Sequence, residues 1–131
     1  MRKSILLFTL LIGAVMLVSA CSQASAPGDS TGAKPVTIQV KSDPDPAVVG
    51  DVTFTLLITD ESGAPLEGAR VDIGVDHADM TGMSMSGPAT EQSEGHYSIS
   101  ANFSMSGNWK MTVYVRKDSL DYKEDLELKI Q

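Results

Sequence analysis

The residues best suited to chemistry lie in one short segment, 76–87, which reads Asp-His-Ala-Asp-Met-Thr-Gly-Met-Ser-Met-Ser-Gly. It places the imidazole of His77 close to the thioethers of Met80, Met83 and Met85. Thioether sulfur is a soft, neutral ligand, and together with imidazole it favours Cu(I) over hard ions such as Mg²⁺ or Ca²⁺. The segment therefore predicts a copper site, with Cu(I) as the expected ion.

Packing is the alternative interpretation of the same side chains, because methionine also fills irregular gaps in protein cores. The Ser, Thr and Gly residues between Met80, Met83 and Met85 are poor core formers, which favours binding. For His77, an ordinary histidine at a strand end is as consistent with the sequence as a metal ligand is. Both interpretations of the segment therefore stay open.

A further candidate ligand, Met105, comes from a later part of the chain. His77 has the parity of an inward-facing residue at the end of a strand, so we expect its ring to point toward the interior. If segment 83–91 runs back as a strand, the strand that begins at His96 returns to the same end and brings Met105 near His77. If that segment is a loop, the placement of Met105 is open. Packing beside neighbouring aromatic residues is the alternative for this methionine.

The carboxylates of Asp76 and Asp79 flank this segment's histidine in the sequence. We expect them to orient the imidazole by hydrogen bonding or to bind Cu(II) directly. Thioethers neither titrate nor form disulfides, so they remain available as ligands in an oxidising compartment.

The segments that must position these side chains have the pattern of short β-strands. Apolar and polar residues alternate along six stretches, 36–40, 52–58, 71–75, 97–103, 109–115 and 126–130. This period of two is typical of strands with one buried face, and turn-forming sequences such as 43–46 and 60–63 separate them. The pattern predicts an all-β fold, an immunoglobulin-like antiparallel β-sandwich of about seven strands, with Trp109 in its core.

The first 20 residues have the pattern of a secretory signal peptide, with Arg2 and Lys3 ahead of an apolar run at 5–18. Residues 18–21, Val-Ser-Ala-Cys, resemble the lipobox of bacterial lipoproteins. That resemblance implies cleavage before Cys21 and lipid attachment at this residue. We therefore expect residues 1–20 to be a lipoprotein signal peptide. The protein is then extracytoplasmic and lipid-anchored to a bacterial membrane.

The rest of the chain divides into two parts by composition. Residues 21–34 are small and polar, as in a lipidated N-terminus followed by a flexible linker, and residues 35–131 form the immunoglobulin-like domain. Cys21 is the only cysteine, which excludes an intramolecular disulfide, a blue-copper centre and a cysteine-based zinc site.

The charge balance and the scarcity of catalytic groups narrow the function further. Without Arg2 and Lys3, 10 basic residues become 8, and against 17 acidic residues the formal charge is −9. The chain has no basic cluster, so nucleic acid is not an expected partner. With 2 histidines and no nucleophile motif, we expect a protein that is not an enzyme.

Five segments, taken in their order along the chain, resemble the YtkA-like/FixH-like family of bacterial extracytoplasmic domains. They are Pro-Ala-Val-Val-Gly at 46–50, Asp-Glu-Ser-Gly-Ala-Pro-Leu-Glu-Gly-Ala at 60–69, the methionine-rich loop, Gly-His-Tyr at 95–97, and Phe-Ser-Met-Ser-Gly-Asn-Trp at 103–109. The resemblance covers roughly Pro46 to Val115. It implies a β-sandwich outside the cytoplasm with a link to copper handling or to assembly of haem–copper oxidases. FixH proteins carry a transmembrane anchor, whereas this chain has a lipobox-like sequence that implies a lipid anchor.

Two functions are consistent with this sequence. The first is a membrane-anchored lipoprotein that acts as a copper chaperone, buffer or oxidase-assembly accessory, with copper-delivery or oxidase-assembly proteins as partners. Its predicted metal ligands are His77, Met80, Met83, Met85 and Met105. The alternative is a non-catalytic immunoglobulin-like module for protein–protein contact or adhesion in the cell envelope. The sequence does not define the oligomeric state.

Overall fold

The structure is a computed structural model that describes residues 34–131. The predicted signal peptide, Cys21 and all but the last residue of the predicted linker lie outside the described residues. Within residues 34–131, no helix has the length and hydrophobicity needed to cross a membrane.

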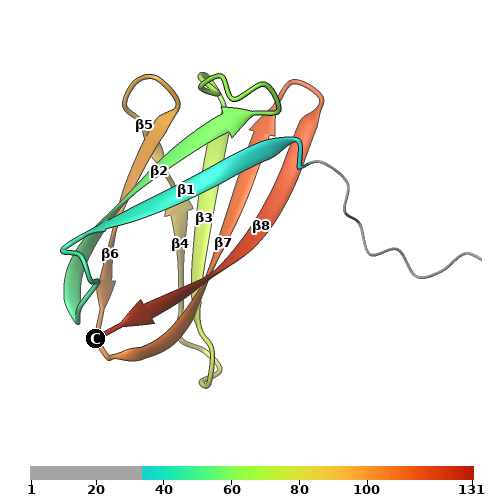
Figure 1. The fold of residues 1–131 in the computed structure, drawn as a ribbon. Helices are drawn as coiled ribbons and strands as arrows, with labels where there is room; N and C mark the ends of the chain where they lie inside the picture. Colours follow the sequence, from blue (N-terminus) through green and yellow to red (C-terminus); the bar gives the residue numbers. More distant parts are fainter. Residues whose placement is uncertain (1–33) are drawn as a thin grey trace, which may run out of the picture. The chain divides into compact units, whose positions relative to one another are not determined.

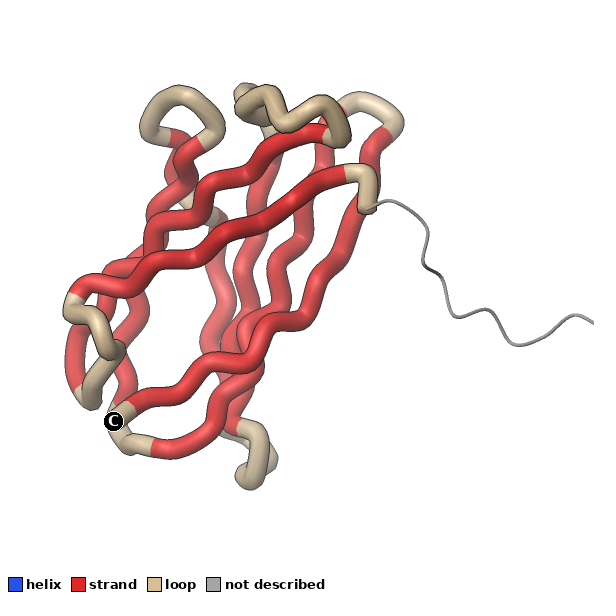
Figure 2. The backbone as a smooth tube through the Cα atoms, in the orientation of Figure 1, coloured by secondary structure: helices blue, strands red, loops and turns tan. Residues whose placement is uncertain are grey.

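The domain consists of eight strands in two layers (Figures 1 and 2). They are β1 (Val36–Asp43), β2 (Gly50–Asp60), β3 (Arg70–His77), β4 (Ser84–Pro88), β5 (Thr90–Glu91), β6 (His96–Phe103), β7 (Gly107–Lys117) and β8 (Leu120–Ile130). One antiparallel sheet has the order β1-β2-β6-β5 and the other β4-β3-β7-β8. These orders correspond to strands ABED and CFG of an immunoglobulin domain, with β4 as an added strand beside C. The predicted all-β sandwich is confirmed, with one strand more than expected.

The core lies between the sheets and is built from alternate residues of every strand except β5, whose two residues are exposed. Val52, Phe54, Leu56 and Ile58 of β2 are completely buried, as the period-two pattern predicts. Each such side chain contributes about 1.5–3 kcal/mol through removal from water. Trp109 on β7 is also buried, which confirms its predicted place in the core.

Segment 83–91 is divided between the two sheets. Its first part, β4, pairs with β3, whereas the two residues of β5 pair with β6. Because β4 runs back from the end where β3 finishes, β6 returns to that end, as the placement of Met105 required. β8 begins six residues before the predicted stretch 126–130. Its first half keeps the period of two with Leu120 and Tyr122 inward, but the charged Glu124 takes the next inward position.

We call one end of the sandwich the distal end. It is formed by the connections 44–49, 78–83 and 104–106 together with Gln131, and it lies at the bottom of Figure 1. The described chain begins at the other end, with Lys34 beside the start of β1. Since β1 has eight residues, the two ends are separated by about 26 Å.

Candidate metal site at the distal end

Three residues, Met83, His77 and Trp109, lie side by side across the distal end. His77, the last residue of β3, is paired with Trp109 of β7 on one side. On the other side, the His77 N–H donates a 3.0 Å hydrogen bond to the carbonyl of Met83. Residues opposite each other on neighbouring strands have Cβ atoms about 4.5–5.5 Å apart. The imidazole therefore has the indole of β7 on one side and Met83, the residue that precedes β4, on the other.

Met85 lies one step deeper on the same inward face. It pairs with Val75 of β3, and Val75 in turn pairs with Met111 of β7. Met85 is half-buried against the core, whereas Met111 is only 1% exposed. Two residues along a strand correspond to about 6.6 Å, so Met83 and Met85 present neighbouring thioethers. Met111 is part of the hydrophobic core and is not a candidate ligand.

The other two candidate methionines come from distal loops. Met80 lies between β3 and β4 and is 47% exposed, the most exposed of the large hydrophobic side chains in the described chain. Met105 lies between β6 and β7 and is half-buried against the core. The fold thus brings Met80, Met83 and Met105 to the same end as His77, and ligation by these side chains stays a prediction.

Both nitrogens of the His77 ring already have close neighbours. Nδ1 lies 3.2 Å from the backbone nitrogen of Asp79 and accepts its hydrogen bond. Nε2 faces Gly107, where an added Cβ would lie only 2.9 Å from it. The ring also packs edge-on against Trp109 at a centroid distance of 4.8 Å. Ligation through Nδ1 would require His77 to release the Asp79 N–H.

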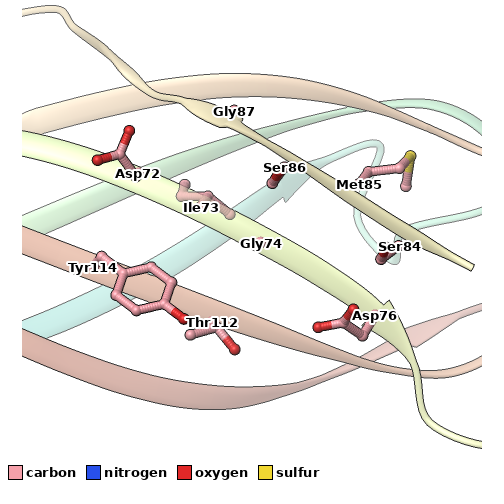
Figure 3. Close-up of a pocket in the computed structure, with 10 residues that line it drawn as sticks. All are labelled: Asp72, Ile73, Gly74, Asp76, Ser84, Met85, Ser86, Gly87, Thr112 and Tyr114. Carbon is pink, nitrogen blue, oxygen red and sulfur yellow. The ribbon is translucent and has the colours of Figure 1, made fainter. Parts of the chain in front are cut away.

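The aspartates do not take the expected positions around His77. The group of Asp79 that reaches the imidazole is its backbone N–H and not its carboxylate. Asp76 has the opposite parity and lies on the outer face of the sheet, in a shallow depression of about 440 Å³ with Thr112 and Tyr114 (Figure 3). Among residues 34–131, no group of three or more His, Cys, Asp or Glu side chains is placed to hold a metal ion. A metal at the distal end would therefore depend on thioethers.

A chain of aromatic rings behind His77 was not predicted from the sequence. Trp109 packs edge-on against Phe103 at 5.0 Å, and Phe103 packs edge-on against Phe54 at 5.9 Å. Edge-to-face contacts of this kind add about 0.5–1.5 kcal/mol each beyond the burial of area. The alternation in β2, β6 and β7 signals that these rings are buried, but their stacking depends on how the two sheets face each other.

The second histidine belongs to the other end of the domain. His96 is half-buried at the start of β6, and its Nδ1 lies 3.1 Å from the carbonyl oxygen of Ser93. The neighbouring Tyr97 is fully buried, and its hydroxyl donates a 2.7 Å hydrogen bond to the carbonyl of Leu66. His77 is thus the histidine that the fold places beside the methionines.

The fold and this arrangement define an immunoglobulin-like β-sandwich with histidine and methionine side chains gathered at one end. The sequence matches the family described as YtkA-like over residues 30–114, and the chain belongs to that family. The match contains all five candidate ligands and leaves β8 outside. The FixH-like part of the resemblance and the lipoprotein assignment stay predictions.

A comparison with solved structures supports the fold, whereas no curated protein matches the sequence. Among solved structures, the domain is similar to the crystal structure of the PmoD soluble domain from Methylocystis sp. ATCC 49242 (Rockwell), with a TM-score of 0.50 and 14% sequence identity. The similarity covers 73% of this chain and 90% of that chain. At this identity, it shows a shared sandwich fold and nothing about ligands.

Proposed function

We propose that this domain binds Cu(I) at its distal end and acts as a copper chaperone, buffer or oxidase-assembly accessory. The observation that carries the proposal is the row Met83–His77–Trp109, which sets a thioether beside an imidazole at the open end of a rigid sheet. Met80 and Met105 lie in the loops on either side.

The donor set fits a soft monovalent ion. Thioether sulfur and neutral imidazole are ligands that select Cu(I), while hard cations require the oxygen clusters that the described residues do not form. The ligands are neutral, so a bound ion would keep its single positive charge. The acidic surplus of the chain favours accumulation of cations near its surface. Copper is cargo in this proposal.

The ligands would contribute unequally. Met83 and Met85 stand next to and within β4, so their positions are fixed by strand pairing. Met80 and Met105 stand on loops, where Met80 is exposed and Met105 is half-buried against the core. Ligation through Nδ1 of His77 requires loss of the hydrogen bond from Asp79, so ligation by that nitrogen is coupled to the position of loop 78–83.

Attachment and partners are part of the same proposal. The lipobox-like sequence ending at Cys21 supports an extracytoplasmic domain held to a bacterial membrane by lipid. Copper-delivery or oxidase-assembly proteins are the partners that this role requires. The separation of His77 and His96 at opposite ends supports a non-catalytic domain.

A contact module of the cell envelope is the second candidate function. Three large hydrophobic side chains of the described chain are exposed, Val48, Val49 and Met80, and all three lie at the distal end. Exposed apolar residues that gather in one region are typical of protein contact surfaces. In this role, the methionines would meet a partner protein and bind no metal.

An anaerobic Cu(I) titration against a chromophoric chelator separates the two functions. Residues 34–131, which contain both sheets, should retain one Cu(I) per domain. Fluorescence provides a second readout, because Trp109 is the only tryptophan and lies 4.8 Å from His77. Met83→Leu and Met85→Leu should each weaken binding at least tenfold, whereas Met111→Leu, a matched change in the core, should leave it unchanged. Equal affinity in all three variants would exclude the proposed site, and no retention by the parent domain would favour the contact module.

A further inference from the structure

The two open sides of the sandwich differ in charge. On one side, β1 and β8 are the edge strands, and β8 carries Asp121, Lys123, Glu124, Asp125, Glu127 and Lys129. Charged side chains on an edge strand prevent another chain from pairing with it. The β1/β8 side is thereby protected against strand addition.

The other side, between β4 and β6, has no such protection. β5 covers the edge of β6 only at Tyr97 and Ser98, and no strand within residues 34–131 pairs with the remaining edge at Ile99–Phe103. Neither Ser84–Pro88 nor Ile99–Phe103 contains a charged residue. A free strand edge of five residues, about 17 Å long, is thus left without a blocking charge.

A cleft of about 340 Å³ lies along this free edge. Its lining includes Phe54, Val75, Met85, Ile99 and Ala101, and its polar members, Ser86, Ser100 and Asn102, are uncharged. At Gly87, an added Cβ would lie 3.7 Å from Cδ1 of Ile99, so β4 and β6 are already in close contact there. The volume is within the range of about 300–1,000 Å³ that is usual for ligand sites. The cleft is thus an apolar slot beside unpaired backbone groups.

We propose that the free edge of β6 at Ile99–Phe103 is a docking site for an extended, uncharged segment of another protein. The segment would pair with β6 in line with β5, so that backbone hydrogen bonds provide affinity. Its alternate apolar side chains would enter the cleft beside Met85 and provide specificity. This is recognition by strand addition, and it does not depend on copper binding.

The acidic surplus of the domain and the position of Lys34 indicate that the occupant is a separate protein. Two copies of a domain with a large acidic surplus repel each other, which disfavours self-pairing. The described chain begins at Lys34, which contacts Glu124 of β8 on the opposite side of the sandwich. An acidic or basic segment would lose hydration in the cleft with no opposite charge to compensate. An uncharged segment has no such cost.

The test uses a defined probe, an acetylated and amidated octapeptide of alternating threonine and valine, added to ¹⁵N-labelled domain. Shift changes and slowed amide exchange should concentrate at Ile99–Phe103. Ser100→Lys, which adds a charge to the free edge, should weaken binding at least tenfold. Thr37→Lys, the matched change on the exposed face of β1, should leave it unchanged. The amide spectra of the free variants report whether each one is folded.

Peroxide oxidation followed by mass spectrometry gives a second readout without substitutions. The bound peptide should slow sulfoxidation of Met85 in the cleft and leave the exposed Met80 unaffected. Absence of binding at millimolar peptide, or equal loss of binding in both lysine variants, would overturn the proposal. Concentration-dependent dimers that Ser100→Lys abolishes would overturn it as well, because the occupant would then be a second copy.

Discussion

The imidazole of His77 rests against the backbone of Gly107, a residue that follows it by 30 positions in the sequence. A Cβ at Gly107 would lie 2.9 Å from Nε2 and 3.5 Å from Cε1 of His77. The φ angle of Gly107 is +137°, a conformation that residues with a side chain rarely adopt. The absence of a side chain at Gly107 therefore allows His77 to pack edge-on against Trp109.

Gly107→Ala should destabilise the domain more than Gly82→Ala. Both glycines have positive φ angles, but an added Cβ at Gly82 meets no atom within 4 Å. The strain of a positive φ costs about 1–3 kcal/mol at either position, and Gly107→Ala also displaces the His77 ring. Urea denaturation measures the difference. Adding His77→Ala to Gly107→Ala should recover part of the loss, and no recovery would show that the ring contact is unimportant.

Replacement of His77 should weaken Cu(I) binding less than replacement of Met83 does. Nδ1 of His77 is engaged by the Asp79 N–H, and this bond must break before the ring is able to bind an ion through that nitrogen. Met83 has no comparable bond to give up. We expect a loss of a few fold in affinity for His77→Ala and at least tenfold for Met83→Leu, measured by chelator competition. The reverse order would mean that the imidazole is the principal ligand.

Tyr97→Phe should lower the free energy of unfolding by about 1–3 kcal/mol, the cost of leaving buried polar groups unpaired. The Tyr97 hydroxyl donates to the carbonyl of Leu66 and accepts the N–H of Ala69 at 3.1 Å. Burial also raises the pKa of this phenol above its usual value. Denaturation in urea at neutral pH measures the loss. Tyr122→Phe is the control: Tyr122 is half-buried on the edge strand β8 and its hydroxyl bonds only to the Glu124 carboxylate, at 3.2 Å, so the loss should be smaller.

Acid should destabilise the parent domain more than the Asp60→Asn variant. The Asp60 carboxylate accepts hydrogen bonds from the Ser62 hydroxyl at 2.6 Å and from the Ala64 N–H at 3.0 Å. The Ser62 bond is the main cause that lowers the pKa of Asp60 below its usual value. A carboxyl with a lowered pKa stabilises the fold above its unfolded pKa of about 3.9. This contribution is lost as the pH falls through the lower folded pKa.

Urea midpoints at pH 6 and pH 3 test this prediction. The decrease between the two values should be smaller for Asp60→Asn than for the parent domain. Glu61→Gln, which changes the adjacent exposed carboxylate, is the matched control. An identical decrease in the parent domain and in Asp60→Asn would show that the turn does not contribute to acid sensitivity.

The period of two predicted the inward residues of β2, β3, β6 and β7, because each of these strands has one face against the core. It missed Thr112 of β7, which has the opposite parity and is also buried. It failed for the first half of β8, where the charged Glu124 takes an inward position between Tyr122 and Leu126. The exposed face of this edge strand also carries charges, which help it to avoid pairing with another chain. Its pattern therefore resembles that of a polar loop.

The candidate site was predicted only as far as strand direction allowed. The return of β6 placed Met105 at the same end as His77, as the parity argument required. The contacts of the His77 ring depend on Gly107 and Asp79, and neither follows from spacing. Gly107 approaches from a neighbouring strand, and the Asp79 N–H is positioned by the turn after β3. Side-chain types gave the candidate ligands, while the tertiary fold determined which of their atoms are already engaged.

The location of Gln131 has a practical consequence for any affinity measurement. Its N–H donates to the carbonyl of Ala47, its carbonyl accepts from the N–H of Val49, and the preceding Ile130 pairs with Gly107. A polyhistidine tag fused after Gln131 would therefore emerge beside the candidate ligands and supply imidazoles of its own. A tag ahead of Lys34 would emerge about 26 Å away, at the other end of β1. Purification handles belong at that end, where they leave the methionines undisturbed.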